Sequence, residues 1–143
     1  MLIHGGCHCG NIRFSLPWFP APAEIVARVC ACSFCTKHGN VWASRPESHL
    51  DVAIRDADRV KHYEFGTRTA QFHVCATCGI VPLVTSRIGG KTYAVVNANT
   101  FSENSIPLRR VPAILDDESE TARLARRARD WIGRVTFRTQ SPA

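Results

Sequence analysis

Short stretches of alternating apolar and polar residues run through most of the chain. Apolar side chains occupy every second position over residues 12–16 and 50–54, and Phe72 and Val74 flank His73. A period of two is typical of β-strands that bury one face. The pattern therefore predicts a mainly β protein built from small antiparallel sheets.

A β-hairpin is the clearest local prediction. Two runs rich in β-branched residues, 81–87 and 91–97, flank the pair Gly89-Gly90. Consecutive glycines adopt the positive φ angles that a two-residue hairpin turn requires. The proline-rich segment 17–22 is instead expected to be a loop, because proline donates no backbone hydrogen bond.

One helix is expected near the C-terminus, over residues 118–134. Its apolar positions repeat at helical spacing, and Asp117 with Glu120 fits a capping box. We expect this face to be buried: Leu124, Ala128, Trp131 and Val135. The opposite face carries Arg123, Arg126, Arg127 and Arg129. Residues 139–143 are expected to fray.

The length and the lack of long apolar runs limit the class of protein. A chain of 143 residues fits a single domain, 1–143, with its own hydrophobic core. The N-terminus lacks the pattern of a secretory signal, and no segment is long and apolar enough for a membrane span. Seven cysteines, an odd number, favour reduced thiols in the cytoplasm. The oligomeric state stays open, a homo-oligomer included.

The chain is basic, with a formal net charge of +6, and its C-terminal part is the most densely charged. From Ser105 onward, eight arginines face five acidic residues. This charge favours anionic ligands and raises the alternative of a nucleic-acid- or protein-binding module that uses the basic helix. Against nucleic acid, the helix has an acidic first turn, and the chain lacks aromatic residues interleaved with basic ones for base stacking.

The cysteines fall into three clusters whose spacing is that of metal ligands. Two thiolates one or two residues apart can bind one tetrahedral Zn²⁺, and a following glycine lets the backbone turn beneath the sulfur. The clusters are Cys7 and Cys9, then Cys30, Cys32 and Cys35, then Cys75 and Cys78.

These clusters predict two zinc ions per chain in different roles. Cys7, Cys9, Cys75 and Cys78 make a closed four-sulfur site, which is structural. The three sulfurs of Cys30, Cys32 and Cys35 leave one coordination position, as in a catalytic zinc site. Alternatively, His38 closes this second site, and the protein is then a scaffold with two structural zincs. His8 and His73 are expected at the surface or behind the ligands.

Three thiolates determine what an open zinc would bind. They give the site a net negative charge, so the metal is a poor Lewis acid but a good host for a further thiolate. Bound in this way, a thiol is ionised at neutral pH and ready to attack an electrophile such as an aldehyde.

The motifs also resemble a known family. The segments Gly-Gly-Cys-His-Cys-Gly at 5–10, Cys-Ala-Cys-Ser-Phe-Cys-Thr-Lys-His-Gly at 30–39, Val-Cys-Ala-Thr-Cys-Gly at 74–79 and Asn-Ala-Asn-Thr at 97–100 resemble the glutathione-dependent formaldehyde-activating enzymes, whose family includes centromere protein V. The resemblance covers about residues 3–115. The basic helical extension, about 117–135, lies beyond the usual end of that domain.

This resemblance implies a fold, an activity and substrates. It implies a β-tent-like zinc-binding fold, with the structural and catalytic zincs on the cysteines assigned above. The implied activity is that of a carbon-sulfur lyase, S-(hydroxymethyl)glutathione synthase, acting on glutathione and formaldehyde. Candidates for binding the glutathione carboxylates are Arg13, Lys37, Arg68, Asn97 and Asn99.

Overall fold

Two β-sheets form most of the molecule in this computed structural model, which describes residues 1–103, 105–115 and 117–140. The four-stranded sheet has the order β1-β2-β5-β11 and the seven-stranded sheet the order β10-β3-β4-β9-β8-β7-β6. The strands of the first sheet are β1 (Leu2–Gly6), β2 (Ile12–Pro17), β5 (Leu50–Ile54) and β11 (Val135–Thr139). Those of the second are β3 (Ile25–Cys30), β4 (Val41–Ala43), β6 (Val60–Tyr63), β7 (Gln71–Cys75), β8 (Leu83–Ile88), β9 (Lys91–Asn97) and β10 (Leu108–Ala113).

The predicted alternation is confirmed in the first sheet. In β2, Ile12, Phe14 and Leu16 are buried, and β2 pairs antiparallel with β5, which buries alternate residues in the same way. The hairpin is also confirmed: β8 and β9 pair antiparallel around Gly89 and Gly90, both of which have positive φ. The segment 17–22 is a loop after its first residue.

The sheets are mixed rather than purely antiparallel. Strand β10 pairs parallel with β3, and β11 pairs parallel with β5. Both β10 and β11 come from the C-terminal part of the chain, and each is an edge strand of its sheet. Strand β11 includes Val135, which the sequence analysis placed on the buried side of the helix, and Thr139, the first residue of the predicted frayed end. Residues 141–143 of that predicted end lie outside the described part of the chain.

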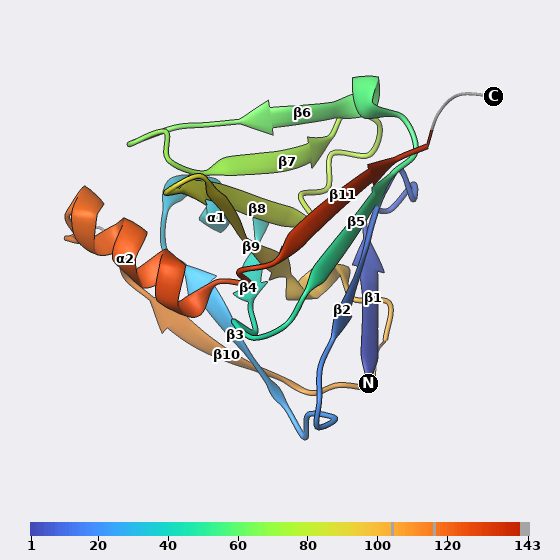
Figure 1. Cartoon of the computed structure of the whole chain (residues 1–143), viewed down its shortest axis with the longest axis horizontal. Coiled ribbons are helices and arrows are strands. Elements are labelled where there is room, and N and C mark those ends of the chain that lie inside the picture. The colour runs from blue at the N-terminus through green and yellow to red at the C-terminus, as the bar shows by residue number, and fades with distance from the viewer. Residues whose placement is uncertain (104, 116, 141–143) are drawn as a thin grey trace.

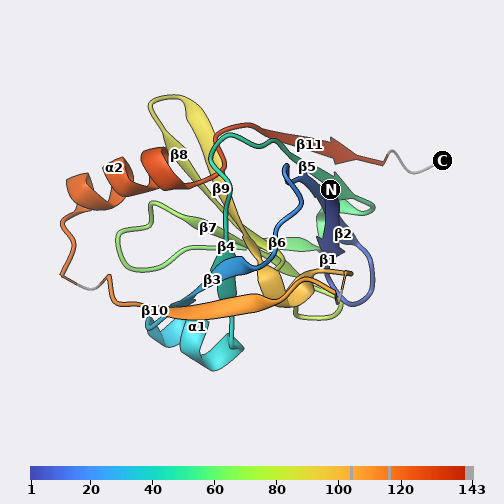
Figure 2. The same ribbon diagram turned by 90° about the horizontal axis from the view of Figure 1, so that it is seen from below.

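Two short helices and two 3₁₀ turns complete the described part of the fold. Helix α1 (Ser33–His38) was not predicted, and α2 (Glu120–Asp130) is shorter than expected. The 3₁₀ turns are η1 (Ala57–Arg59) and η2 (Ala98–Thr100). Figure 1 shows α2 at the end of the molecule opposite β1, and Figure 2 shows it beside the β8–β9 hairpin. No helix in the described ranges is long and apolar enough to span a membrane.

The start and end of α2 differ from the prediction for local reasons. Ser119, not Asp117, caps the helix, because its hydroxyl accepts a hydrogen bond of 3.1 Å from the amide of Ala122. The helix ends at Asp130 because Ile132 exchanges two backbone hydrogen bonds, of 2.9 and 3.0 Å, with Ala94 of β9. This bridge fixes the segment after α2 to the larger sheet.

The buried side chains form two clusters. The larger lies between the sheets and includes Ile3, Leu16, Leu50, Leu83 and Ile132, all fully buried. The smaller includes Trp42, Phe72, Val84, Val95 and Trp131 and lies next to Cys35. The consecutive residues Trp131 and Ile132 thus belong to different clusters, and the C-terminal segment contributes to both.

Candidate metal centres

The four-cysteine group joins the two sheets. Cys7 and Cys9 follow β1 of the smaller sheet, whereas Cys75 ends β7 of the larger sheet and Cys78 lies in the turn after it. All four sulfur atoms lie within 4.8 Å of one another. The Sγ atoms of Cys9 and Cys75 are 3.5 Å apart, although 66 positions separate the two residues along the chain. The residues predicted to form one site do meet in space.

Glycine turns present these sulfur atoms. Gly10 and Gly79 have φ values of 83° and 81°, a left-handed conformation that costs a residue with a side chain free energy. Their amides donate to the carbonyl groups of Cys7 and Cys75, at 3.1 and 2.8 Å. The turns hold the backbone beneath each pair of thiols, as the spacing predicted.

The three-cysteine group is local. Cys30 ends β3, Cys32 caps the N-terminus of α1, and Cys35 lies in the middle of α1. The Cys32 sulfur accepts a hydrogen bond of 3.4 Å from the amide of Cys35. The indole Nε1–H of Trp42 donates to the Cys35 sulfur at 3.4 Å. Sequence reasoning missed this Trp42 contact, because no motif links β4 to the cluster.

His38 does not join this group. The three sulfur atoms lie within 4.8 Å of one another, and no histidine or carboxylate of the described residues shares that neighbourhood. His38 is exposed, and its ring instead packs at a tilt of 42° against Phe34, with 4.5 Å between the ring centroids. The geometry gives no support to the alternative in which His38 closes the site.

A further histidine, His73, is buried. It is only 5% exposed, so of the two positions that the sequence analysis allowed, at the surface or behind the ligands, the surface is wrong. Its Nε2 lies 2.8 Å from the hydroxyl of Thr85, and its ring stacks on Phe137 of β11. Burial, together with the nearby charge of His62, lowers the pKa of His73 to about 3. By contrast, His8 is exposed, as expected.

The electrostatics of both groups suit a cation. Burial raises the pKa of Cys7 to about 12, and it also raises the pKa of Cys32. The pKa of Cys35 is raised by its hydrogen bond to the Cys30 thiol and by burial. Crowded, partly buried thiols therefore resist ionisation unless a positive charge lies between them. A thiophilic divalent metal provides that charge, and both donor sets fit one.

Cys78 differs from Cys7 in the same group. Burial tends to raise its pKa, but hydrogen bonds with the backbone of Ile80 and Cys9 outweigh this effect, and the pKa is lowered to about 6. Its thiol is thus ionised more readily than that of Cys7, which suits metal capture at neutral pH.

A cavity of about 220 Å³ lies beside the three-cysteine group. Cys30, Cys32 and Cys35 form part of its lining, next to aromatic side chains and the loop between β6 and β7. The aromatic lining residues are Trp42, Phe65, Phe72 and Trp131. The four-cysteine group does not line this cavity, so only one of the two groups is placed to meet a small molecule there.

Arginines line the same cavity. Arg28 comes from β3, and Arg123, Arg126 and Arg127 come from α2. The sequence analysis assigned the α2 arginines to an outer face and expected Ala128 to be buried. In the structure Ala128 is exposed and Arg127 is buried. Their spacing at 123, 126 and 127, which places three side chains on one face of a helix, was the signal that could have identified them.

The five residues proposed to bind carboxylates lie elsewhere. None of Arg13, Lys37, Arg68, Asn97 and Asn99 lines the cavity. Asn97 is buried, and its side-chain amide donates to Asn40 and to the carbonyl of Val81, each at 3.0 Å. The 97–100 segment therefore shapes the end of β9 and η2 rather than the cavity wall.

Comparison with known proteins places the chain in a family. The model of the family described as glutathione-dependent formaldehyde-activating enzyme matches residues 2–113. A structural-genomics crystal structure of a Rhodobacter sphaeroides protein is 32% identical, with a TM-score of 0.54, over 74% of this chain and 99% of that one. The residues matched by the family model include both cysteine groups, while α2 and β11 lie outside them. The chain belongs to the glutathione-dependent formaldehyde-activating enzyme family.

Proposed function

We propose that the protein is a two-zinc enzyme of the carbon-sulfur lyase type that joins a small thiol to an aldehyde. Glutathione and formaldehyde are the pair that the family name indicates. The observation that carries the proposal is the placement of three clustered cysteines, with no fourth ligand among the described residues, in the lining of a cavity.

Each cysteine group has a proposed role. Cys7, Cys9, Cys75 and Cys78 would hold a structural zinc, because four thiolates leave no position for a substrate. Cys30, Cys32 and Cys35 would hold the catalytic zinc. When bound there, zinc supplies a fourth position that accepts a thiol and favours its thiolate form.

The surrounding residues prepare the cavity for this reaction. The Trp42 indole holds the Cys35 sulfur in place through its hydrogen bond, and such outer contacts orient metal ligands. Aromatic walls limit the entry of water, which strengthens electrostatic interactions inside. Overall, the thiol sulfur bonds to the carbonyl carbon, the C=O π pair moves to the oxygen, and the thiol proton ends on that oxygen through solvent. The reverse reaction cleaves the same bond.

The structure favours an enzyme over a nucleic-acid-binding module. Of the four α2 arginines, only Arg129 is largely exposed, with 71% of its side chain accessible. Arg123 and Arg126 are 20% and 18% exposed, and their guanidinium groups pair with Glu118. A phosphate backbone would therefore meet little of this charge.

We also propose that residues 1–143 form one domain. Strand β11 completes the sheet begun by β1 and β2, and Trp131 and Ile132 enter the two buried clusters. The C-terminal extension is thereby integrated with the family core.

Exchange NMR tests the activity directly. Labelled formaldehyde and glutathione form their adduct spontaneously, so the quantity to compare is the exchange rate at equilibrium with and without protein. We expect the zinc-loaded protein to increase this rate and Cys32→Ser to abolish the increase. Thr36→Ala, a change of an exposed residue on the same helix, serves as the matched control and should keep the activity. An exchange rate equal to that of buffer, with both sites loaded, would overturn the proposal.

A further inference from the structure

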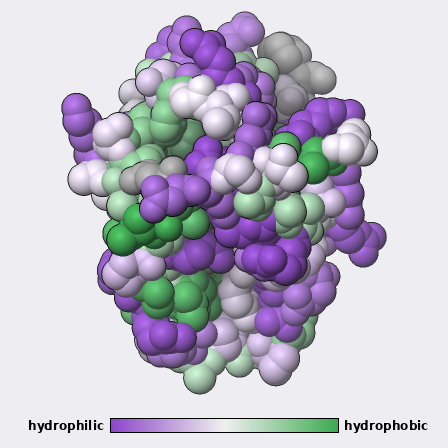
Figure 3. All heavy atoms as spheres, turned by 90° about the vertical axis from the view of Figure 1, so that its left-hand side faces the viewer, coloured by the Kyte–Doolittle hydropathy of each residue, from purple (hydrophilic) through white to green (hydrophobic). Residues whose placement is uncertain are grey.

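Helix α2 forms a wall of the cavity, although it lies outside the residues that the family model matches. Its side chains therefore add to the site something that the matched core does not contain. The space-filling view shows hydrophobic residues interspersed with hydrophilic ones on the face where α2 lies (Figure 3). Such a mixed surface suits a ligand with an apolar part and a charged part.

The charged side chains that line the cavity are all positive. They are Arg28, Arg123, Arg126 and Arg127, and no aspartate or glutamate is among the described lining residues. Close by, Glu118 pairs with Arg126 and Arg123. Arg28 donates to the hydroxyl of Ser44, at 3.0 Å, rather than to a carboxylate. The cavity therefore carries an excess of positive charge.

Arg127 is the most buried of these arginines, at 9% exposed. Its Nη1 donates to the hydroxyls of Thr69 and Ser86, at 2.9 and 3.2 Å, and its guanidinium stacks over Trp131. Its buried Nε has no hydrogen-bond partner. Burial and the charges of Arg126 and Arg123 lower the pKa of Arg127 to about 10. A buried cation beside two further cations that share a single carboxylate costs free energy, which a bound anion would offset.

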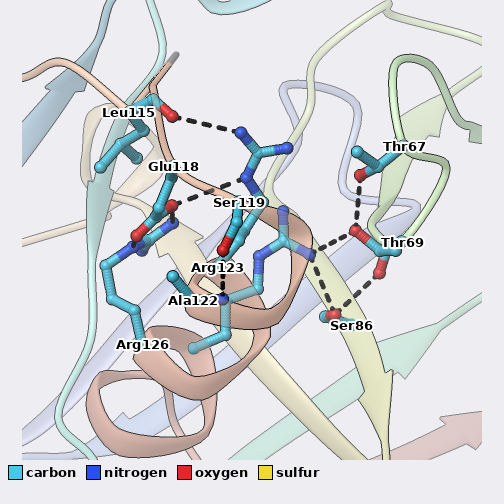
Figure 4. Close-up of polar contacts among 10 residues, drawn as sticks. Thr67, Thr69, Ser86, Leu115, Glu118, Ser119, Ala122, Arg123 and Arg126 are labelled. Carbon is cyan, nitrogen blue, oxygen red and sulfur yellow. Dashed lines mark hydrogen bonds and ion pairs between the residues drawn. The ribbon is translucent and has the colours of Figure 1, made fainter.

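Glu118 shows what kind of anion fits. Its carboxylate accepts hydrogen bonds from Nε and Nη2 of Arg126, at 2.8 and 3.2 Å, in a two-pronged arrangement. Arg123 approaches the same carboxylate at 3.6 Å and donates to the carbonyl of Leu115. Figure 4 shows Arg123 and Arg126 converging on Glu118. The planar fork of a guanidinium matches a carboxylate in this geometry.

We propose that Arg123, Arg126 and Arg127 of α2 form an anion-binding subsite that selects thiol substrates bearing a carboxylate. The proposal rests on the proposed function, since it assumes that the substrate thiol occupies the three-cysteine site of the same cavity. The subsite holds the anionic end of the substrate while the sulfur faces the cysteines. A thiol of similar size without a negative charge gains nothing from the arginines and binds more weakly.

A thiol series measures this selectivity. The cobalt-substituted protein reports thiolate binding through its charge-transfer absorption, and three probes differ only in the group that follows the HS-CH2-CH2 unit: 3-mercaptopropionate, 3-mercapto-1-propanol and 2-mercaptoethylphosphonate. We expect the carboxylate to bind at least about tenfold more tightly than the alcohol, as one charge-assisted hydrogen bond allows. A phosphonate that binds more tightly than the carboxylate would overturn the carboxylate assignment.

Two single variants separate the subsite from general surface charge. Arg126→Gln should weaken 3-mercaptopropionate about tenfold and leave the alcohol unchanged, because Glu118 then engages Arg123 alone. Arg129→Gln is the matched control, since Arg129 lies on the same helix, is largely exposed and pairs with Asp130. It should bind all probes as the unmodified protein does. Thermal unfolding of each variant shows that the fold is intact.

A ligand without a thiol separates failure of the subsite from failure of the proposed function. S-methylglutathione keeps its carboxylates but supplies no thiolate, and its binding is followed by the fluorescence of Trp42 and Trp131, which line the cavity. We expect saturable binding to the zinc protein that Arg126→Gln weakens and Arg129→Gln does not.

The outcomes are distinct. If thiols bind to cobalt with affinities that depend neither on their charge nor on Arg126, the subsite is wrong and the proposed function stands. If no thiol alters the cobalt spectrum while S-methylglutathione still binds through Arg126, the proposed function is wrong and the anion subsite remains. If S-methylglutathione does not bind and the carboxylate thiol has no advantage, the inference is overturned.

Discussion

The two cysteine groups have the same donor atoms but differ in how much of the fold each one holds together. Cys7 follows a strand of one sheet and Cys75 ends a strand of the other, whereas Cys30, Cys32 and Cys35 lie at the end of one strand and in the helix after it. A metal in the first group closes a long-range contact, and its binding free energy contributes to folding. A metal in the second group joins residues that local structure already brings together.

The two cysteine groups also differ in the side chains and cavities that surround them. Cys7 and Cys75 belong to the large cluster between the sheets, and of their group only Cys7 borders a hollow among the described residues, whereas Cys30, Cys32 and Cys35 all line one cavity with aromatic and arginine side chains. The comparison teaches that long-range placement favours a structural role and that a whole ligand group facing one cavity favours a chemical role. Each prediction below tests this division.

Removal of a ligand from each group should have the largest and most unequal effects. Cys75→Ser should prevent folding, because a structural zinc contributes about 10–16 kcal/mol, comparable with the total stability of a domain. Cys32→Ser should leave the protein folded and monodisperse. Thermal melts followed by circular dichroism, together with gel filtration, measure both. Equal destabilisation by the two changes would show that both groups are structural.

The C-terminal segment should stabilise the large cluster. Ile132 is fully buried within it, so Ile132→Ala should lower the free energy of unfolding by about 2–5 kcal/mol. Leu124 of α2 is only half-buried, and Leu124→Ala should cost less. Urea titration of both variants provides the comparison. A loss for Leu124→Ala as large as that for Ile132→Ala would mean that α2, rather than the Ile132 bridge, fixes the extension to the core.

Chelation should remove the two metals in order. The three-cysteine group should release zinc first, at least about tenfold faster, because the proposed fourth ligand would exchange and all three cysteines line the cavity. The four-cysteine group should release zinc only as the sheets separate. Zinc release measured with a colorimetric indicator, in parallel with circular dichroism, tests this order. Release in a single phase that coincides with unfolding would contradict it.

The smallest expected effect concerns Trp42. Trp42→Phe removes the hydrogen bond to the Cys35 sulfur while keeping an aromatic ring, and it should cost about 1 kcal/mol of stability. Metal affinity should fall at the three-cysteine group alone, because the lost contact orients one of its ligands. Competition titrations with a zinc indicator resolve the two sites. If metal affinity fell at the four-cysteine group instead, the claim that Trp42 supports the three-cysteine group would be wrong.

Features set by neighbouring residues were predictable from the sequence. The spacing within each cysteine cluster, the alternation in β2 and β5, and the Gly89-Gly90 hairpin depend on contacts across a few positions. Cys7 and Cys9 were grouped with Cys75 and Cys78 because each pair is followed directly by a glycine. The structure brings these four cysteines together. The mainly β fold and the family resemblance followed from the same local patterns.

Features set by distant partners were decided only by the tertiary structure. Helical periodicity predicted that Arg127 is exposed and Ala128 buried, because the method considers only where apolar residues recur. It cannot foresee Thr69, Ser86 and Trp131, which contact the buried guanidinium of Arg127. His73 likewise becomes buried because β11 packs against it. Strand β11 itself forms through parallel pairing with β5, a distant segment to which no hairpin turn connects it, so local sequence signals did not predict this pairing. Since the free energy of burial depends on what covers a side chain, the arginine-lined cavity could be recognised only once the chain had folded back on its own core.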